Sequence, residues 1–118
     1  MTVREIAEKL ELKVHAGASG LDREVTGGYA SDLLSDVMAN ANSGDIWVTL
    51  QVHQNVAAVA LLTKVAAVVL VGGREPAPET AEKADASGIP ILSTTRRTFE
   101  TVALLSGLGI GSRQPEPA

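Results

Sequence analysis

The segment from Asp22 to Gly28 has the residue types of a binding loop. Its sequence, Asp-Arg-Glu-Val-Thr-Gly-Gly, combines an acceptor, a planar cation, a hydroxyl and two adjacent glycines. Glycines adopt positive φ and let a ligand or another backbone approach closely. Successive amide N–H groups beside an arginine can bind an anion. Three interpretations stay open: a structural turn, an anion-binding loop, and a contact between subunits.

The structural interpretation gives each residue of this segment a local task. The Thr26 hydroxyl would bond a nearby backbone group, and the two glycines would turn the chain toward a helix capped by Ser31. Asp22 would pair with Arg23 or with a neighbouring loop. The residues that we assign to this group, as interface or ligand contacts, are Asp22, Arg23, Thr26, Gly27, Gly28, Tyr29 and Ser31.

Small and polar residues also follow three predicted strands. In open parallel sheets ligands bind beyond the carboxyl ends of the strands, where helix N-termini also point. A phosphate or a polar loop could be cradled there, although Gly, Ser and Thr are equally ordinary loop and capping residues. Both interpretations stay open. The strand-end ligand candidates are Thr49, Gln51, His53, Asn55, Gly72, Gly73, Arg74, Ser93 and Thr94.

Catalysis and metal binding receive little support from the sequence. His53 is the acid–base candidate near the strand ends, but no local residue pattern provides the group that would orient it. His15 is expected in a surface loop. Two distant histidines without carboxylates at ligand spacing predict no metal site. No Gly-x-x-x-x-Gly-Lys-Ser/Thr motif occurs, so a P-loop kinase is excluded, and no catalytic residue is assigned.

The composition narrows the classes of partner. The chain has 118 residues, 45% hydrophobic and 3% aromatic, with a formal net charge of -4. One domain is expected. The charge and the few aromatic residues argue against a nucleic-acid partner. No cysteine is present, and neither a signal sequence nor a membrane-length apolar run is found. We therefore expect no membrane partner and a cytoplasmic location.

The hydrophobic pattern predicts an α/β fold, with a mainly parallel sheet flanked by helices in a layered single domain. A strand that is apolar at every position requires cover on both faces of the sheet, and strand–helix alternation implies parallel pairing. Leu33, Leu34, Val37 and Met38 are expected to form the buried stripe of their helix. The domain is expected to span 1–108, and 109–118 to be a disordered tail. Expected helices are 2–10, 31–40, 55–64, 78–87 and 97–105; expected strands are 12–14, 24–25, 45–50, 65–71 and 89–92.

The pattern Asp22-Arg23-x-x-Thr26-Gly27-Gly28 resembles the motif that names the DRTGG domain family. The likeness continues in 29–38, in 44–51 with His53, in 73–76 and in 88–94, so it covers about residues 1–108. Such domains are similar to the N-terminal domain of HPr kinase/phosphorylase and to the first domain of certain Mur ligases. They occur as regulatory parts of some phosphotransacetylases, and between CBS domains of some inorganic pyrophosphatases.

The resemblance implies a non-catalytic regulatory or interaction domain. In those pyrophosphatases adenine nucleotides regulate the enzyme. The domain also contributes to the contact between subunits there, so the resemblance implies a homodimer or a larger homo-oligomer. An adenine nucleotide, or another small anion, would be a regulatory ligand and not a permanent cofactor. An apolar patch near helix 31–40 or around Trp47 would form the subunit contact.

Two alternatives to a regulatory sensor remain. Stand-alone versions of the domain occur beside iron-only hydrogenase genes, which favours an adaptor subunit docking on a partner enzyme. The other is a small hydrolase or transferase that uses His53.

Overall fold

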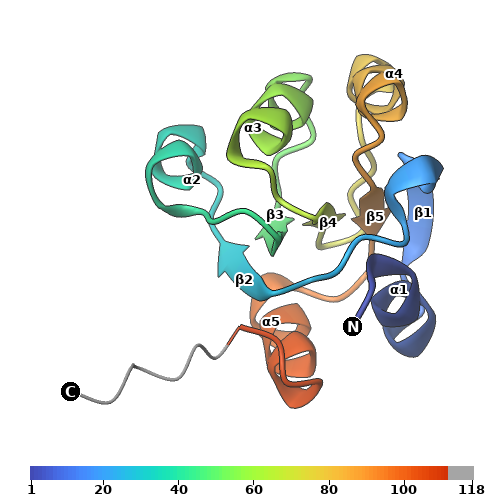
Figure 1. Ribbon diagram of the computed structural model, residues 1–118, viewed down its shortest axis with the longest axis vertical. Helices are drawn as coiled ribbons and strands as arrows, with labels where there is room; N and C mark the ends of the chain where they lie inside the picture. The colour runs from blue at the N-terminus through green and yellow to red at the C-terminus, as the bar shows by residue number, and fades with distance from the viewer. Residues whose placement is uncertain (112–118) are drawn as a thin grey trace.

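A five-stranded sheet separates two layers of helices (Figure 1). The computed structural model describes residues 1–111. Helices α2, α3 and α4 cover one face of the sheet, and α1 and α5 cover the other. The elements are α1 (Val3–Leu10), β1 (Lys13–Ala16), the 3-10 turn η1 (Ala18–Gly20), β2 (Gly27–Ala30), α2 (Leu34–Asn40), β3 (Asp45–Thr49), α3 (Asn55–Thr63), β4 (Ala67–Leu70), α4 (Pro78–Ser87), β5 (Ile91–Ser93) and α5 (Thr98–Gly107).

The strands lie in the order β1-β5-β4-β3-β2. Neighbours from β2 to β5 pair in parallel, and β1 pairs antiparallel with β5. The predicted α/β fold with a mainly parallel sheet is confirmed. Both edges of the sheet come from the first quarter of the chain, since β1 lies at one edge and β2 at the other.

The central strands are buried on both faces, as their continuous apolar sequence predicts. One core lies between the sheet and helices α1 and α5, and the other lies beneath α2, α3 and α4. Trp47 of β3 is completely buried in the second core, where its indole N–H donates to the Ser31 carbonyl at 2.9 Å. The Trp47 side chain therefore cannot form the apolar patch expected around it, and the subunit contact itself stays a prediction.

Helix α1 begins as its sequence predicts. The Thr2 hydroxyl accepts the Glu5 N–H, while the Glu5 carboxylate accepts the Thr2 N–H, which completes a capping box. These bonds hold the pKa of Glu5 below its usual value. The expected helix 78–87 is also confirmed as α4, with Pro78 in its first turn and Gly88, in the left-handed conformation, at its end.

Helix α2 departs from prediction at both its cap and its buried face. The N-cap is Leu33, and Ser31 uses its hydroxyl to accept the Leu33 N–H at 3.2 Å. Val37 is buried, but Leu33 is 65% exposed and Met38 47% exposed. The helix packs over β2, which is an edge strand, so less of its surface is covered than that of a helix over the middle of the sheet.

Ile110, beyond α5, packs into the core. It is 8% exposed, and its N–H donates to the Leu105 carbonyl at 3.1 Å. The predicted tail, 109–118, falls for the most part on residues 112–118, which lie outside the described part of the chain. The proposed domain boundary stays a prediction. None of the helices within residues 1–111 has the length and apolar character that a membrane crossing requires.

Candidate functional site

Residues 21–25 hold the start of α1. The first N–H groups of a helix have no partner within the helix, and here the carbonyls of Arg23 and Leu21 accept from Val3 at 3.0 Å and Arg4 at 2.8 Å. Asp22 does not pair with Arg23. Its carboxylate accepts from the Arg4 Nε at 2.9 Å, which lowers the pKa of Asp22. This part of the motif is an anchor for α1.

The paired glycines form no turn. Gly27 and Gly28 lie in the extended strand β2, and neither has a positive φ. A methyl group built on Gly28 would lie 3.7 Å from the Ile46 side chain, an ordinary contact. The anion-binding nest proposed for these residues is therefore wrong, because its geometry requires a turn. Close approach does require glycine at Gly17 and Gly20, where an added methyl group would overlap backbone carbonyls.

Thr26 closes the other end of the segment. Its N–H donates to the Gly44 carbonyl at 2.9 Å, and its hydroxyl reaches the Ser43 carbonyl at 3.5 Å. The expectation that Thr26 bonds nearby backbone is confirmed, although the hydroxyl contact is long. Gly44 has φ +85, and a side chain there would collide with the Thr26 hydroxyl. Thr26 thus sets the entry into β3.

Tyr29 and Ser31 fasten α2 to the sheet. The Tyr29 hydroxyl donates to the Asp36 carboxylate at 2.7 Å, and Asn40 donates to the same carboxylate at 2.9 Å. The hydrogen bond to Asp36 raises the pKa of Tyr29, and those from Tyr29 and Ser31 lower the pKa of Asp36. The motif residues therefore hold α1, β3 and α2 in place and do not converge on one cavity.

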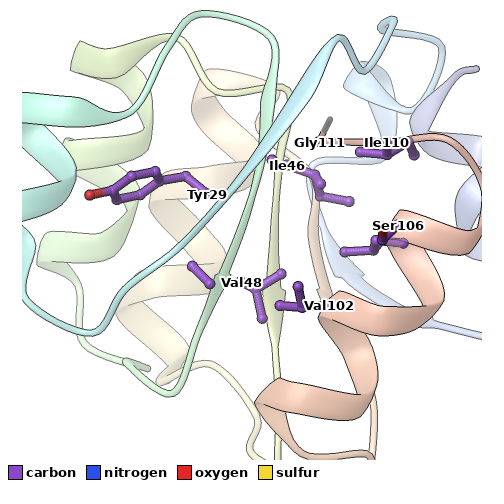
Figure 2. A pocket seen from close by; sticks show the side chains of 10 residues that line it. Tyr29, Ile46, Val48, Val102, Ser106, Ile110 and Gly111 are labelled. Atoms are coloured by element: carbon purple, nitrogen blue, oxygen red, sulfur yellow. The ribbon is translucent and has the colours of Figure 1, made fainter. Parts of the chain in front are cut away.

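An apolar groove lies between β2 and α5 (Figure 2). Its volume is about 220 Å³. Ile46, Val48 and Val102 point into it, while the Tyr29 ring points away from α5. Phe99, one helical turn before Val102, is 89% exposed. The groove has the character of a contact surface for apolar side chains. The residues that line it are Gly28, Tyr29, Ala30, Ile46, Val48, Val102, Leu105, Ser106, Ile110 and Gly111.

The candidates at the end of β3 form a structural cluster. Asp32 accepts hydrogen bonds from the Thr49 hydroxyl at 3.0 Å and the Leu50 N–H at 2.7 Å, and its carbonyl accepts from the Gln51 side chain at 3.0 Å. Thr49 is completely buried. These polar groups satisfy one another, so they close the end of the strand.

His53 and Asn55 lie at the start of α3, and both are exposed. His53 lines a shallow hollow with Gln54, Ala77 and Glu79. Within residues 1–111 no hydrogen bond orients its ring. The geometry that a general base requires is not provided.

The ends of β4 and β5 and the start of β1 surround a polar pocket, which we name the β1–β5 pocket. Its volume is about 340 Å³. Three of the strand-end candidates, Gly73, Ser93 and Thr94, meet here, whereas Gly72 and Arg74 are not among the lining residues. The structure therefore divides the predicted strand-end group into separate sites. The lining residues are Glu11, Lys13, Gly73, Glu75, Ser93, Thr94, Thr95 and Arg96.

The Gly72-Gly73 turn does not offer its amides to a ligand. Gly72 has φ +71 and Gly73 φ +75, as the glycine pair predicts. The Gly72 N–H donates to the Arg96 carbonyl at 2.7 Å, and the Gly73 N–H donates to the Thr94 carbonyl at 3.0 Å. Both donors are already used. These two amides therefore provide no recognition in the β1–β5 pocket.

The charged groups of this pocket are held at different depths. The Lys13 ammonium lies 3.3 Å from the Glu75 carboxylate, and both side chains are largely exposed. Arg96 is more enclosed, since one guanidinium nitrogen donates to the Leu10 carbonyl at 2.7 Å and another lies 3.9 Å from Glu100. Arg96 is thus fixed in place, whereas the Lys13–Glu75 pair can rearrange.

His15 lies on strand β1 and not in a surface loop. The pairing of β1 with β5 shifts register between Val14 and Ala16, which makes His15 the irregular position. Its Nε2 lies 2.6 Å from the Ser93 hydroxyl. Partial burial, with Lys13 nearby, lowers the pKa of His15, and Glu75 opposes this effect. No carboxylate within residues 1–111 is hydrogen bonded to its ring.

Sequence reasoning missed the residues that arrive from β1 and from the loop after β5. Lys13 and His15 are far from Arg96 in sequence, and none of the three belongs to a local motif, so only the β1–β5 pairing reveals them. Within the described chain no group of three His, Cys, Asp or Glu residues could hold a metal ion. Every buried side-chain N or O atom there also has a hydrogen-bond partner.

Comparisons with known proteins place the chain. The profile of the DRTGG domain family matches residues 5–108. A similar solved structure contains the CBS and DRTGG domains of the regulatory region of Clostridium perfringens pyrophosphatase, complexed with its activator, diadenosine tetraphosphate. The TM-score is 0.74 and the identity 16%, over 99% of this chain and 53% of that one. This chain thus spans about half of that structure's length. No curated protein matches the sequence significantly. The family profile covers most of the sequence, and the chain belongs to the DRTGG domain family.

Proposed function

We propose that this chain is a non-catalytic regulatory domain that self-associates and responds to a small anionic ligand, with an adenine nucleotide as the first candidate. The observation that carries the proposal is the fold. It matches the regulatory region of a pyrophosphatase over 99% of this chain. That region was crystallised with a dinucleotide activator, which supports the choice of ligand.

The arrangement of acid–base groups supports a non-catalytic role. His53 is exposed without an orienting partner, and the Ser93–His15 pair has no third group to complete a triad. Phosphoester and ester substrates test this point. We expect no turnover above that of the double variant His15→Gln, His53→Ala, and turnover that this variant abolishes would contradict the proposal.

The ligand is tested by thermal denaturation with AMP, ATP and diadenosine tetraphosphate. A ligand that binds only the native state raises the melting temperature, and the rise grows with the logarithm of the ligand concentration above its Kd. We expect at least one of the three to do so. If none does at millimolar concentration, the sensor role fails, and an adaptor role for a partner enzyme would then be favoured.

Self-association is proposed through the groove between β2 and α5. Phe99 and Val102 form an exposed apolar strip beside that groove, and β2 is an edge strand. Sedimentation velocity at micromolar concentration should show a dimer that Phe99→Ser weakens. Met38→Ser, on the exposed face of α2, is the matched control, because α2 is the surface that the sequence favours. Sedimentation as a monomer alone would contradict the proposed self-association.

A further inference from the structure

The β1–β5 pocket carries charges of both signs around a row of hydroxyl groups. Lys13 and Arg96 provide the cations, Glu11 and Glu75 the carboxylates, and Ser93, Thr94 and Thr95 the hydroxyls. We propose that this pocket binds the ribose-phosphate part of a nucleotide. The inference rests on the proposed function, and it names which part of the ligand is recognised and where.

The phosphate would lie between Arg96 and Lys13. Arg96 is already fixed by its bond to the Leu10 carbonyl at 2.7 Å, so little side-chain freedom is lost when it binds an anion. Lys13 can leave Glu75, since that ion pair is exposed and such pairs are weak. Hydroxyl donors from Ser93 and Thr94 complete a phosphate environment that does not need the Gly72 and Gly73 amides.

His15 controls what Ser93 can donate. The two side chains are 2.6 Å apart. When Nε2 carries the proton, His15 donates to the Ser93 oxygen, and the hydroxyl hydrogen of Ser93 is free to point at the phosphate. The groups that face His15 are Lys13 on its own strand and Glu75 on the loop after β4. The ring meets Ser93 at the position where the register of β1 is irregular.

The two carboxylates argue for a sugar in addition to the phosphate. They balance the two cations, so a bare polyphosphate would meet as much repulsion as attraction. A carboxylate that accepts from ribose hydroxyls is the arrangement found in dinucleotide-binding folds. Glu11 and Glu75 line the same pocket as the fixed arginine and offer acceptors to a vicinal diol.

The base would not be recognised. The aromatic residues of the chain are Tyr29, Trp47 and Phe99, and none of them lines the pocket. Without an aromatic surface for stacking, adenine contributes little. The volume of about 340 Å³ is at the lower end of the range for ligand sites. It suits one ribose-phosphate unit better than an amino acid, a smaller molecule that could satisfy the same charges.

Calorimetric titrations of the full chain test the proposal with AMP, GMP, 2′-deoxy-AMP, ribose 5-phosphate and adenosine. We expect AMP, GMP and ribose 5-phosphate to bind within about threefold of one another, while 2′-deoxy-AMP is weaker by about tenfold and adenosine is weaker still. Amide shifts of Ser93 and Thr94 in NMR spectra should move with each ligand that binds.

Charge variants locate the site, and the control variants replace exposed residues of the same type on helix α1. Lys13→Gln should lower the affinity for AMP by about tenfold, as expected for the loss of one charge-assisted contact. Lys9→Gln on α1 should leave that affinity unchanged. Glu11→Gln and Glu75→Gln should reduce the preference for AMP over 2′-deoxy-AMP, and Glu8→Gln should leave it intact. All of these side chains are exposed, so the variants are expected to fold.

The outcomes separate this inference from the proposed function. If Lys13→Gln leaves the affinity for AMP unchanged, or if AMP and 2′-deoxy-AMP bind with equal affinity, the inference is overturned. The proposed nucleotide sensor is not affected by either result. If ribose 5-phosphate binds in the pocket but no adenine nucleotide binds, the site is supported and the proposed ligand is overturned. If an amino acid saturates the pocket and ribose 5-phosphate does not bind, the inference is overturned. If no ligand of the series binds, both the inference and the proposed function are overturned.

Discussion

Gly17 lies directly against the carbonyl group of Ile89, and a side chain on Gly17 would occupy the place of that carbonyl. Gly17 also has φ +73, and its N–H donates to the Asp85 carboxylate at 2.7 Å. The contact joins the turn after β1 to the segment between α4 and β5. It fixes one wall of the region in which β1 meets β5.

Replacing Gly17 with alanine should destabilise the protein strongly. The methyl group must displace backbone, and overpacking of this kind costs about 1–3 kcal/mol before the unfavourable φ is added. Gly28→Ala is the control, since its φ is not positive and its methyl group fits. Urea denaturation should show Gly28→Ala within about 1 kcal/mol of the native protein. Equal losses in the two variants would contradict our account of the motif glycines.

Replacing Glu11 or Lys64 with glycine should stabilise the protein. These residues have φ 54 and φ 60, the non-glycine positions with positive φ among residues 1–111, and both end helices. Glycine relieves a strain of about 0.5–1 kcal/mol at such ends. Denaturation midpoints check the prediction. Both variants should be more stable, but only Glu11→Gly should also impair the proposed ribose contact.

Removing the Tyr29 hydroxyl should raise the pKa of Asp36. The hydrogen bond from Tyr29 is the largest cause of the lowered pKa of that carboxylate, so Tyr29→Phe removes its main stabilisation. A carboxylate titration by NMR measures the change directly. Ser31→Ala should raise the pKa by a smaller amount. An unchanged Asp36 pKa in Tyr29→Phe would show that Tyr29 does not hold α2 through this bond.

Stability should fall below neutral pH because of His15. Its pKa is lower in the folded protein than the usual 6.5. The unfolded chain therefore binds the proton more readily as pH falls through 6.5, and folding loses free energy down to the folded pKa. No contribution is expected above that window. Urea denaturation of the native protein and of His15→Gln at pH 7.5 and 5.5 should show a smaller pH dependence in the variant. His53→Gln serves as the control.

Elements with strong local signals are predictable from the sequence. The capping box of α1, the apolar runs of β3 and β4, and the Pro78 and Gly88 ends of α4 each specify their structure within about ten residues. Strand β2 is different, because Gly27-Gly28 is typical of a turn by residue type. Its parallel pairing with β3 overrides that preference, which no local pattern reveals.

The candidate site was predictable only in part. The rule that ligands bind beyond the ends of parallel strands led to Ser93, Thr94 and Gly73, which do line the β1–β5 pocket. The same rule could not indicate that the glycine amides are already engaged by the loop after β5. Nor could it find His15, which meets Ser93 across a separation of 78 positions.

The pairing of β1 with β5 sets the order in which the pocket can form. Strands β2 to β5 follow one another in both sequence and space, so they can assemble through nearby contacts. Strand β1 can pair only after β5 has formed, and long-range pairings of this kind form late in folding. The region around β1 is therefore expected to open before the rest of the sheet. A molecule bound between Lys13 and Arg96 would bridge β1 and the loop after β5, and would thereby stabilise the pairing of β1 with β5. Amide hydrogen exchange in β1 would slow when the molecule binds.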